Sequence, residues 1–134
     1  MEAVLQMELF PKANKRDIQQ AKEHLENYRL MHRNLQIYSE KLILSSEERA
    51  LLEYAKRLLP EIDTAFKLIM DEEVNKILTH RYITVGKHKY TIAKYVSNTS
   101  ISTINRRIDA GIRTIANCLK LSGVLYIELK EFRR

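Results

Sequence analysis

The chain has 134 residues, of which 45% are hydrophobic and 30% charged, and its formal net charge is +6 at pH 7. This hydrophobic content is too high for a disordered chain, and no apolar run reaches the roughly 18 residues of a membrane-spanning helix. A lone cysteine, Cys118, excludes an internal disulfide and a cysteine-rich zinc site. Because only three glycines and two prolines are present, the composition predicts an all-α protein of about one domain. The acidic start differs from a secretory signal and favours a cytoplasmic location.

Basic residues are concentrated in the second part of the chain. Residues 1–80 contain 12 Lys+Arg and 14 Asp+Glu, whereas residues 81–134 contain 11 Lys+Arg and 3 Asp+Glu. A strongly basic region attracts polyanions such as DNA, RNA or an anionic membrane surface. We therefore predict a helical N-terminal region over 1–80, for dimerisation or partner binding, and a polyanion-binding region over 81–134. A solvated basic surface without a ligand is the alternative interpretation.

The chain begins with a segment that lacks helix signals. Over residues 1–13, Pro11 favours an extended arm that ends before the first helix. Asn14 is a suitable N-cap, and hydrophobic residues then recur at helical spacing over residues 15–42. The pattern predicts one long helix whose apolar face is wide enough to pack on a neighbour or on a second chain.

Two further helices are predicted before the basic region. Ser45 and Glu48 have the spacing of a capping box, so a helix is expected to begin here and to end at Pro60. Pro60 is suited to the first turn of a new helix, which the apolar spacing extends to about His80. The adjacent acids Asp71–Glu73 point in different directions around that helix, so we interpret them as a solvated face rather than a metal site.

Residues 90–120 have the pattern of a helix-turn-helix. A short helix is predicted over Tyr90–Ser97, with Lys87–Lys89 as a basic loop before it. After a polar turn, Ser100 is suited to cap a longer helix that extends to about residue 120. The β-prone residues after Gly123 allow either a short strand or a helix. The side chains predicted to face inward are Ile92, Ala93 and Val96 in the first helix and Ile101, Ile104, Ile108, Ile112, Ile115 and Leu119 in the second, beside Gly111.

The outward face of the second helix carries side chains suited to a DNA major groove. Arg106 can bind guanine through two hydrogen bonds, and Asn105 can bind adenine in the same way. Basic side chains and the helix N-terminus are suited to phosphates. The residues predicted to face bases are Ser102, Thr103, Asn105, Arg106, Asp109 and Arg113. Those predicted to contact phosphates are Lys87, His88, Lys89, Lys94, Ser100 and Arg107. An amphipathic helix with an ordinary polar outer face is the alternative interpretation.

The motif 90–120 resembles region 4 of sigma factors and the sigma-like C-terminal segments of small phage regulators. The likeness rests on Tyr90-Thr91-Ile92-Ala93, on Ser100–Arg107, and on Ile77-Leu78 followed by Arg81-Tyr82-Ile83. Together with Leu9-Phe10-Pro11 and Leu25–Arg29, these residues resemble the ArpU family of phage and prophage transcriptional regulators, and also the RinA family. The resemblance implies a DNA-binding activator of late phage genes that acts near RNA polymerase.

The predicted function is sequence-specific binding of double-stranded DNA by a transcriptional regulator, with RNA polymerase as a second partner and a homodimer as the assembly. The alternative is an adaptor that binds RNA polymerase or another regulator without specific DNA contacts. An enzyme is not expected, because no Gly-rich phosphate loop, HExxH motif, nucleophile elbow or paired-cysteine motif is present. We accordingly expect no catalytic residue, metal, cofactor, membrane contact or small-molecule substrate.

Overall fold

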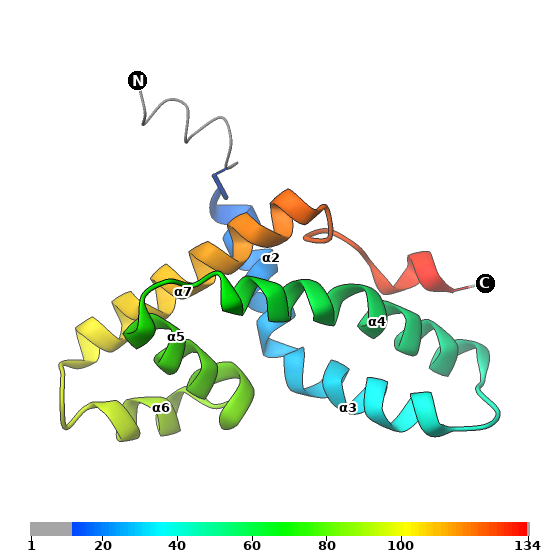
Figure 1. Cartoon of the computed structure of the whole chain (residues 1–134), viewed down its shortest axis with the longest axis horizontal. Helices are drawn as coiled ribbons and strands as arrows, with labels where there is room; N and C mark the ends of the chain where they lie inside the picture. Colours follow the sequence, from blue (N-terminus) through cyan, green and yellow to red (C-terminus); the bar gives the residue numbers. More distant parts are fainter. Residues whose placement is uncertain (1–11, 134) are drawn as a thin grey trace.

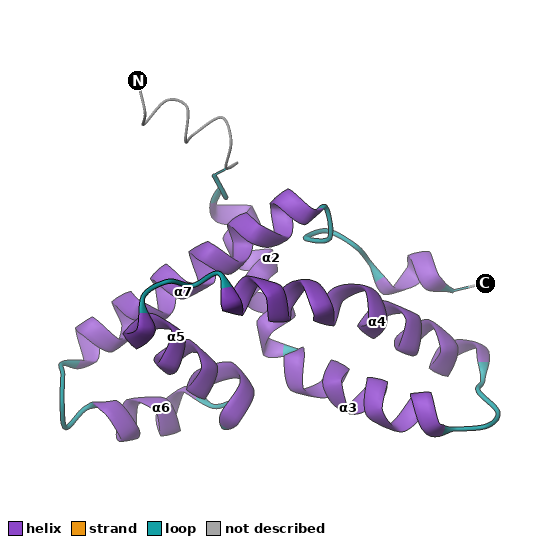
Figure 2. Cartoon of the chain, in the orientation of Figure 1, coloured by secondary structure: helices purple, strands orange, loops and turns teal. Residues whose placement is uncertain are grey.

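The structure, a computed structural model, describes residues 12–133, and over this range the chain forms helices and no strand (Figures 1 and 2). The all-α prediction is therefore confirmed, whereas the arm predicted over residues 1–13 lies almost entirely outside the described residues. The elements are α2 (Lys15–Glu26), α3 (Tyr28–Glu40), α4 (Ser46–Lys67), α5 (Glu72–Thr79), the π-helical turn η1 (His80–Thr84), α6 (His88–Tyr95), α7 (Ile101–Ser122) and the 3-10 turn η2 (Leu129–Phe132).

The segment after α7 contains no strand. Gly123 ends the helix in the left-handed conformation with φ +79°, which a side chain at this position would strain. The chain then continues through two buried residues, Val124 and Leu125, to η2. Within residues 12–133, no helix is both long enough and apolar enough to cross a bilayer.

The prediction of a single helix over residues 15–42 is wrong. The segment forms two helices, α2 and α3, and the chain changes direction between them at Asn27 (Figure 1). Asn27 has φ −94° and ψ 0°, and its N–H is shared between the carbonyls of Glu23 and His24, each at 3.2 Å. α2 packs mainly on α7, whereas α3 packs mainly on α4. A straight helix could not follow both neighbours, so tertiary packing overrides the continuous local pattern.

The start of α4 is as predicted, but its end is not. The Ser45 hydroxyl accepts a hydrogen bond from the Glu48 N–H at 3.1 Å, and the Glu48 carboxylate accepts one from the Ser45 N–H at 2.9 Å. The predicted restart at Pro60 is wrong, since α4 continues through this proline to Lys67. Pro60 is exposed while Leu59 and Ile62 beside it are buried, so core packing offsets the missing backbone hydrogen bond.

The break between helices lies instead at Asp71. Its carboxylate accepts hydrogen bonds from the N–H groups of Glu73 at 2.9 Å and Val74 at 3.2 Å, and it thereby caps α5. Residues 71–73 are exposed, as the prediction of a solvated face requires. They begin a helix, however, rather than lying within one, and their charge is favourable at the N-terminus of α5.

One hydrophobic core contains residues from both the neutral and the basic part of the chain. α7 contacts α2, α4 and α5, so it lies at the centre of this core. The largest fully buried aliphatic side chains are Leu25, Leu58, Ile62, Ile77 and Leu78 before residue 81, and Ile104, Ile115, Leu119, Val124 and Leu125 after it. Burial of each such side chain contributes about 1.5–3 kcal/mol, so α7 is held firmly in place.

Asp17 links the start of α2 to the end of α7 and to the C-terminal segment. Its carboxylate accepts hydrogen bonds from the Tyr126 hydroxyl at 2.5 Å, the Lys120 ammonium at 2.9 Å and the Asn14 N–H at 2.9 Å. The side-chain oxygen of Asn14 accepts a hydrogen bond from the Asp17 N–H, so the predicted cap of α2 is confirmed. The hydrogen bonds from Tyr126 and Lys120 lower the pKa of Asp17 to about 2.

This lowered pKa predicts a specific loss of stability in acid. Because the folded carboxylate has a pKa of about 2 and the ordinary value is 3.8, the unfolded chain takes up the proton first as the pH falls. The contribution of Asp17 is therefore complete above the ordinary pKa and is lost as the pH falls toward 2. Urea unfolding of the wild type and Asp17→Asn across this range measures it. The difference in unfolding free energy between the two proteins should shrink on acidification, and a constant difference would contradict the assignment.

Candidate nucleic-acid interface

The predicted helix-turn-helix corresponds to α6, the turn at residues 96–100, and the first half of α7. The prediction of a basic loop over Lys87–Lys89 is wrong, because α6 (His88–Tyr95) already begins at His88. The three side chains nevertheless remain exposed, so their positions are compatible with a role in binding. Gly86, with φ +73°, makes the tight turn into α6, and a Cβ there would lie 2.9 Å from Nη1 of Arg29.

The inward face of α6 differs from the one predicted. Thr91 is fully buried and accompanies Ile92 and Tyr95 toward the core, whereas Ala93 and Val96 are exposed. The reason is His80 in η1, whose Nδ1 forms a 2.8 Å hydrogen bond with Thr91 Oγ1. The His80 ring also meets the ring of Tyr95 edge-on, with 5.7 Å between centroids. A polar pair therefore holds α6, and hydrophobic periodicity alone does not identify it.

Burial lowers the pKa of His80, and the positive charge of Lys94 lowers it further. The neutral imidazole is therefore the form favoured near pH 7, and it shares one hydrogen with the Thr91 hydroxyl, which can donate or accept according to the ring tautomer. A neutral pair is the form that costs least to bury.

The start and the inward face of α7 agree closely with the prediction. The Ser100 hydroxyl accepts a hydrogen bond from the Thr103 N–H at 3.1 Å and so caps the helix. The predicted inward residues are buried except Ile101, which is 51% exposed at the first position of the helix. Gly111 is also buried, and Leu78 of α5 lies so close to it that a Cβ at this position would be only 2.8 Å from the leucine side chain. The glycine therefore allows α5 and α7 to approach closely.

The predicted base-facing residues lie on the outer side of α7. Ser102, Asn105, Arg106, Asp109 and Arg113 are exposed, and Thr103 is partly exposed. Among the predicted phosphate contacts, Lys87, His88, Lys89, Lys94 and Ser100 are exposed, and Arg107 is partly exposed. The Arg106 guanidinium makes only a 3.3 Å hydrogen bond to the Thr103 hydroxyl, so it is free to turn toward a ligand.

Most cations of this surface have no acidic partner. Arg81 pairs with Glu26 and Lys120 pairs with Asp17, in both cases an acid of α2. Within residues 12–133, none of the others forms an ion pair: Lys87, Lys89, Lys94, Arg106, Arg107 and Arg113. These six side chains, which we call the unpaired cations, come from α6, the residue before it, and α7. They produce a positive potential on this side of the molecule.

The structure brings two residues to this surface that local sequence patterns missed. A groove between α2, η1, α6 and α7 is lined by the polar side chains of Lys22, Glu26, Arg81, His88, Asn105 and Asp109. Lys22 and Arg81 come from elements outside the predicted motif. The packing of α2 along α7 places Lys22 beside Asn105, and the position of η1 places Arg81 there. No short motif could have identified either residue.

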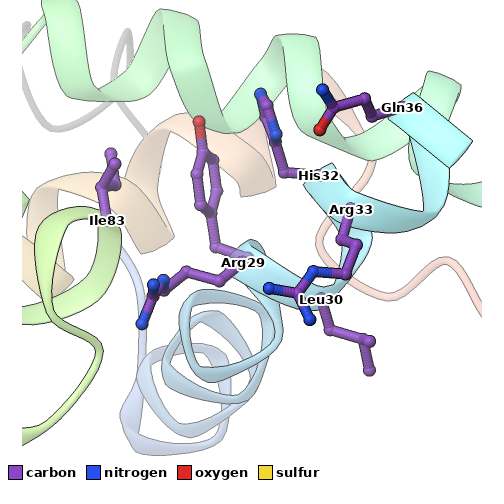
Figure 3. Close-up of a pocket in the computed structure, with 7 residues that line it drawn as sticks. Arg29, Leu30, His32, Arg33, Gln36 and Ile83 are labelled. Atoms are coloured by element: carbon purple, nitrogen blue, oxygen red, sulfur yellow. The ribbon is translucent and has the colours of Figure 1, made fainter.

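Another groove lies at the junction of α3 and η1, where side chains of both elements meet (Figure 3). Arg29, Leu30 and Arg33 line it from α3, and Ile83 lines it from η1. The Arg29 guanidinium donates a 2.9 Å hydrogen bond to the Val85 carbonyl, which fixes the end of η1 against α3. This groove lies on elements other than α6 and α7, and none of the predicted site residues lines it.

Among the described residues, no cluster of His, Cys, Asp or Glu has the geometry of a metal site. Burial raises the pKa of the Cys118 thiol.

Comparison with known proteins finds no matching family model, no matching curated protein and no matching solved structure.

The Thr91–His80 hydrogen bond predicts how firmly α6 is held. Thr91→Val keeps the shape of the side chain but leaves a buried ring nitrogen of His80 without a partner, at a cost of about 1–3 kcal/mol. Amide hydrogen exchange in α6 should accelerate more than exchange in the centre of α7. Thr91→Ser retains the hydroxyl and serves as the control. Equal exchange rates in the valine and serine variants would show that packing alone holds α6.

Proposed function

We propose that the protein is a sequence-specific transcriptional regulator that binds double-stranded DNA through α7, with α6 and the preceding residues on the phosphate backbone. The observation that carries the proposal is the set of six unpaired cations around an exposed polar helix face with a single acid, Asp109. An ordinary amphipathic helix needs a polar outer face, but it does not need its cations to lack acidic partners. DNA phosphates would neutralise these charges.

The dimensions and side chains of α7 support a position in the major groove, which admits one α-helix. Ser102 and Thr103 are short residues in the first turn, so the backbone of α7 can come close to the bases. Arg106 lies nearly two turns after the cap Ser100 and is aligned with Arg113 along the outer face. Two hydrogen bonds from an arginine to guanine are the commonest specific contact of this kind.

The resemblance to the ArpU family supports a more particular proposal. By this likeness, the protein acts on phage or prophage genes as an activator near RNA polymerase, in the cytoplasm. Exposed apolar side chains on α3 and the loop after it, namely Leu30, Ile37, Leu42 and Ile43, support association with a second copy. Light scattering of the purified protein with and without DNA tests for the dimer.

Salt dependence of binding tests the DNA proposal against the adaptor alternative. Each neutralised phosphate of duplex DNA contributes about −0.9 to the slope of log affinity against log salt, so contact by all six unpaired cations gives roughly −5. A shift assay with competitor DNA between about 50 and 200 mM salt measures this slope. We expect a steep decrease in affinity. Absence of DNA binding at physiological salt would overturn the proposal and favour an adaptor that binds only protein.

Two substitutions separate base recognition from phosphate contact. Arg106→Ala should cost about 1–3 kcal/mol on the preferred site and relax the base preference at one position. Lys89→Ala should weaken binding to all sequences by a similar factor and reduce the salt slope by about one. Selection of binding sites from a random pool compares the preferences of the two variants. An unchanged preference in Arg106→Ala would place base recognition on another residue of α7.

A further inference from the structure

The groove beside α7 has an excess of hydrogen-bond donors. Its one internal ion pair joins Arg81 Nη2 to the Glu26 carboxylate at 2.8 Å, so this acid is already engaged. Lys22, His88 and Asn105 line the same groove, and their side chains make no hydrogen bond or ion pair within residues 12–133. Arg81 adds a positive charge at the base of the groove, where its side chain is only 11% exposed.

The position of the groove relative to α7 suggests its ligand. A helix in the major groove has a phosphate backbone on each side of it. Successive residues of a helix are rotated by about 100°, so Asn105 and Arg107 lie on opposite flanks of Arg106. Arg107 supplies a cation on one flank. The groove occupies the other flank, because Asn105 and Asp109 line it.

We propose that this groove receives a backbone phosphate of the bound DNA and that Lys22 of α2 is its principal cationic contact. The inference rests on the proposed function and extends it, since it adds α2 to the DNA-binding surface. Asn105 then lies between the backbone and the base edges. Within residues 12–133, Asp109 is the one carboxylate of the groove without a cationic partner, and in this proposal it opposes the same phosphate.

The attachment of α2 makes Lys22 suited to this role. Asp17 pairs with Lys120 near one end of α2, and Glu26 pairs with Arg81 at the other end. Lys22 lies between these two ion pairs, on a helix that packs along α7, so its backbone has a fixed position beside the groove. A phosphate contact from a fixed position sets the register of a helix on DNA, whereas a contact from a mobile arm contributes affinity only.

Lys22→Gln tests the proposal, with Lys15→Gln as the matched control. Lys15 is on the same helix, is exposed, makes no ion pair within the described residues and does not line the groove. Binding to a non-specific duplex is measured over a range of salt concentrations for both variants and the wild type. We expect Lys22→Gln to bind several-fold more weakly, with the slope of log affinity against log salt reduced by about 0.9. Lys15→Gln should match the wild type.

Asp109→Asn should change the affinity for DNA in the opposite direction. Removal of its charge should strengthen binding to every duplex, because the phosphate no longer faces a carboxylate. Equal slopes for Lys22→Gln and Lys15→Gln would overturn the phosphate site while leaving the proposed function intact, since the wild type still binds DNA in that case. A wild-type chain that fails to bind DNA would overturn the proposed function, and the phosphate site with it.

Discussion

The structure depends on the burial of one face of α7 and on the exposure of the other. Isoleucines at positions 104, 108, 112 and 115 follow the helical repeat and pack among α2, α4 and α5. Gly111 lets α5 approach within the distance that this packing needs. Because the stripe covers one side only, the polar and basic residues between its members must lie outside. The same periodicity therefore determines the core and the candidate interface.

The acids of α2 determine which cations remain available. Asp17 and Glu26 each engage one cation from the basic part of the chain, and both pairs join elements that are far apart in sequence. Ion pairs at a surface contribute little to stability, generally below about 1 kcal/mol. Their larger effect here is on position, since one pair joins α2 to α7 and the other joins α2 to η1. They also leave the remaining basic side chains of α6 and α7 without acidic partners.

Local sequence predicts those features that local interactions decide. The caps at Asn14, Ser45 and Ser100 each depend on two residues three positions apart, and all three were predicted. The buried stripe of α7 also follows directly from its repeat. At Asn27 and Pro60, by contrast, the helix path is decided by neighbouring helices, which a single-chain pattern does not describe.

The candidate site was predictable to the same extent. The outer face of α7 could be derived from its inner face, so the exposed residues were named correctly. Thr91 was missed because its burial depends on the imidazole of His80, which is eleven positions away on another element. Lys22 and Arg81 were missed because their place beside Asn105 depends on how α2 and η1 pack. Polar residues that a distant partner places in a site carry no periodic signal.

Unpaired charge also connects the stability of this fold to the proposed binding of DNA. Six like charges on one side of a small protein repel one another and raise the free energy of the folded state. A bound polyanion removes that repulsion, and binding to the folded chain alone stabilises the fold by mass action. The inner face of α7 is packed in the core, so its outer face would need little ordering on binding DNA. α6 has Thr91 as its one buried residue, so fewer core contacts hold it than hold α7. In the proposed DNA-binding role, the firmly packed α7 would therefore present its outer face without reorganisation, beside the less deeply packed α6.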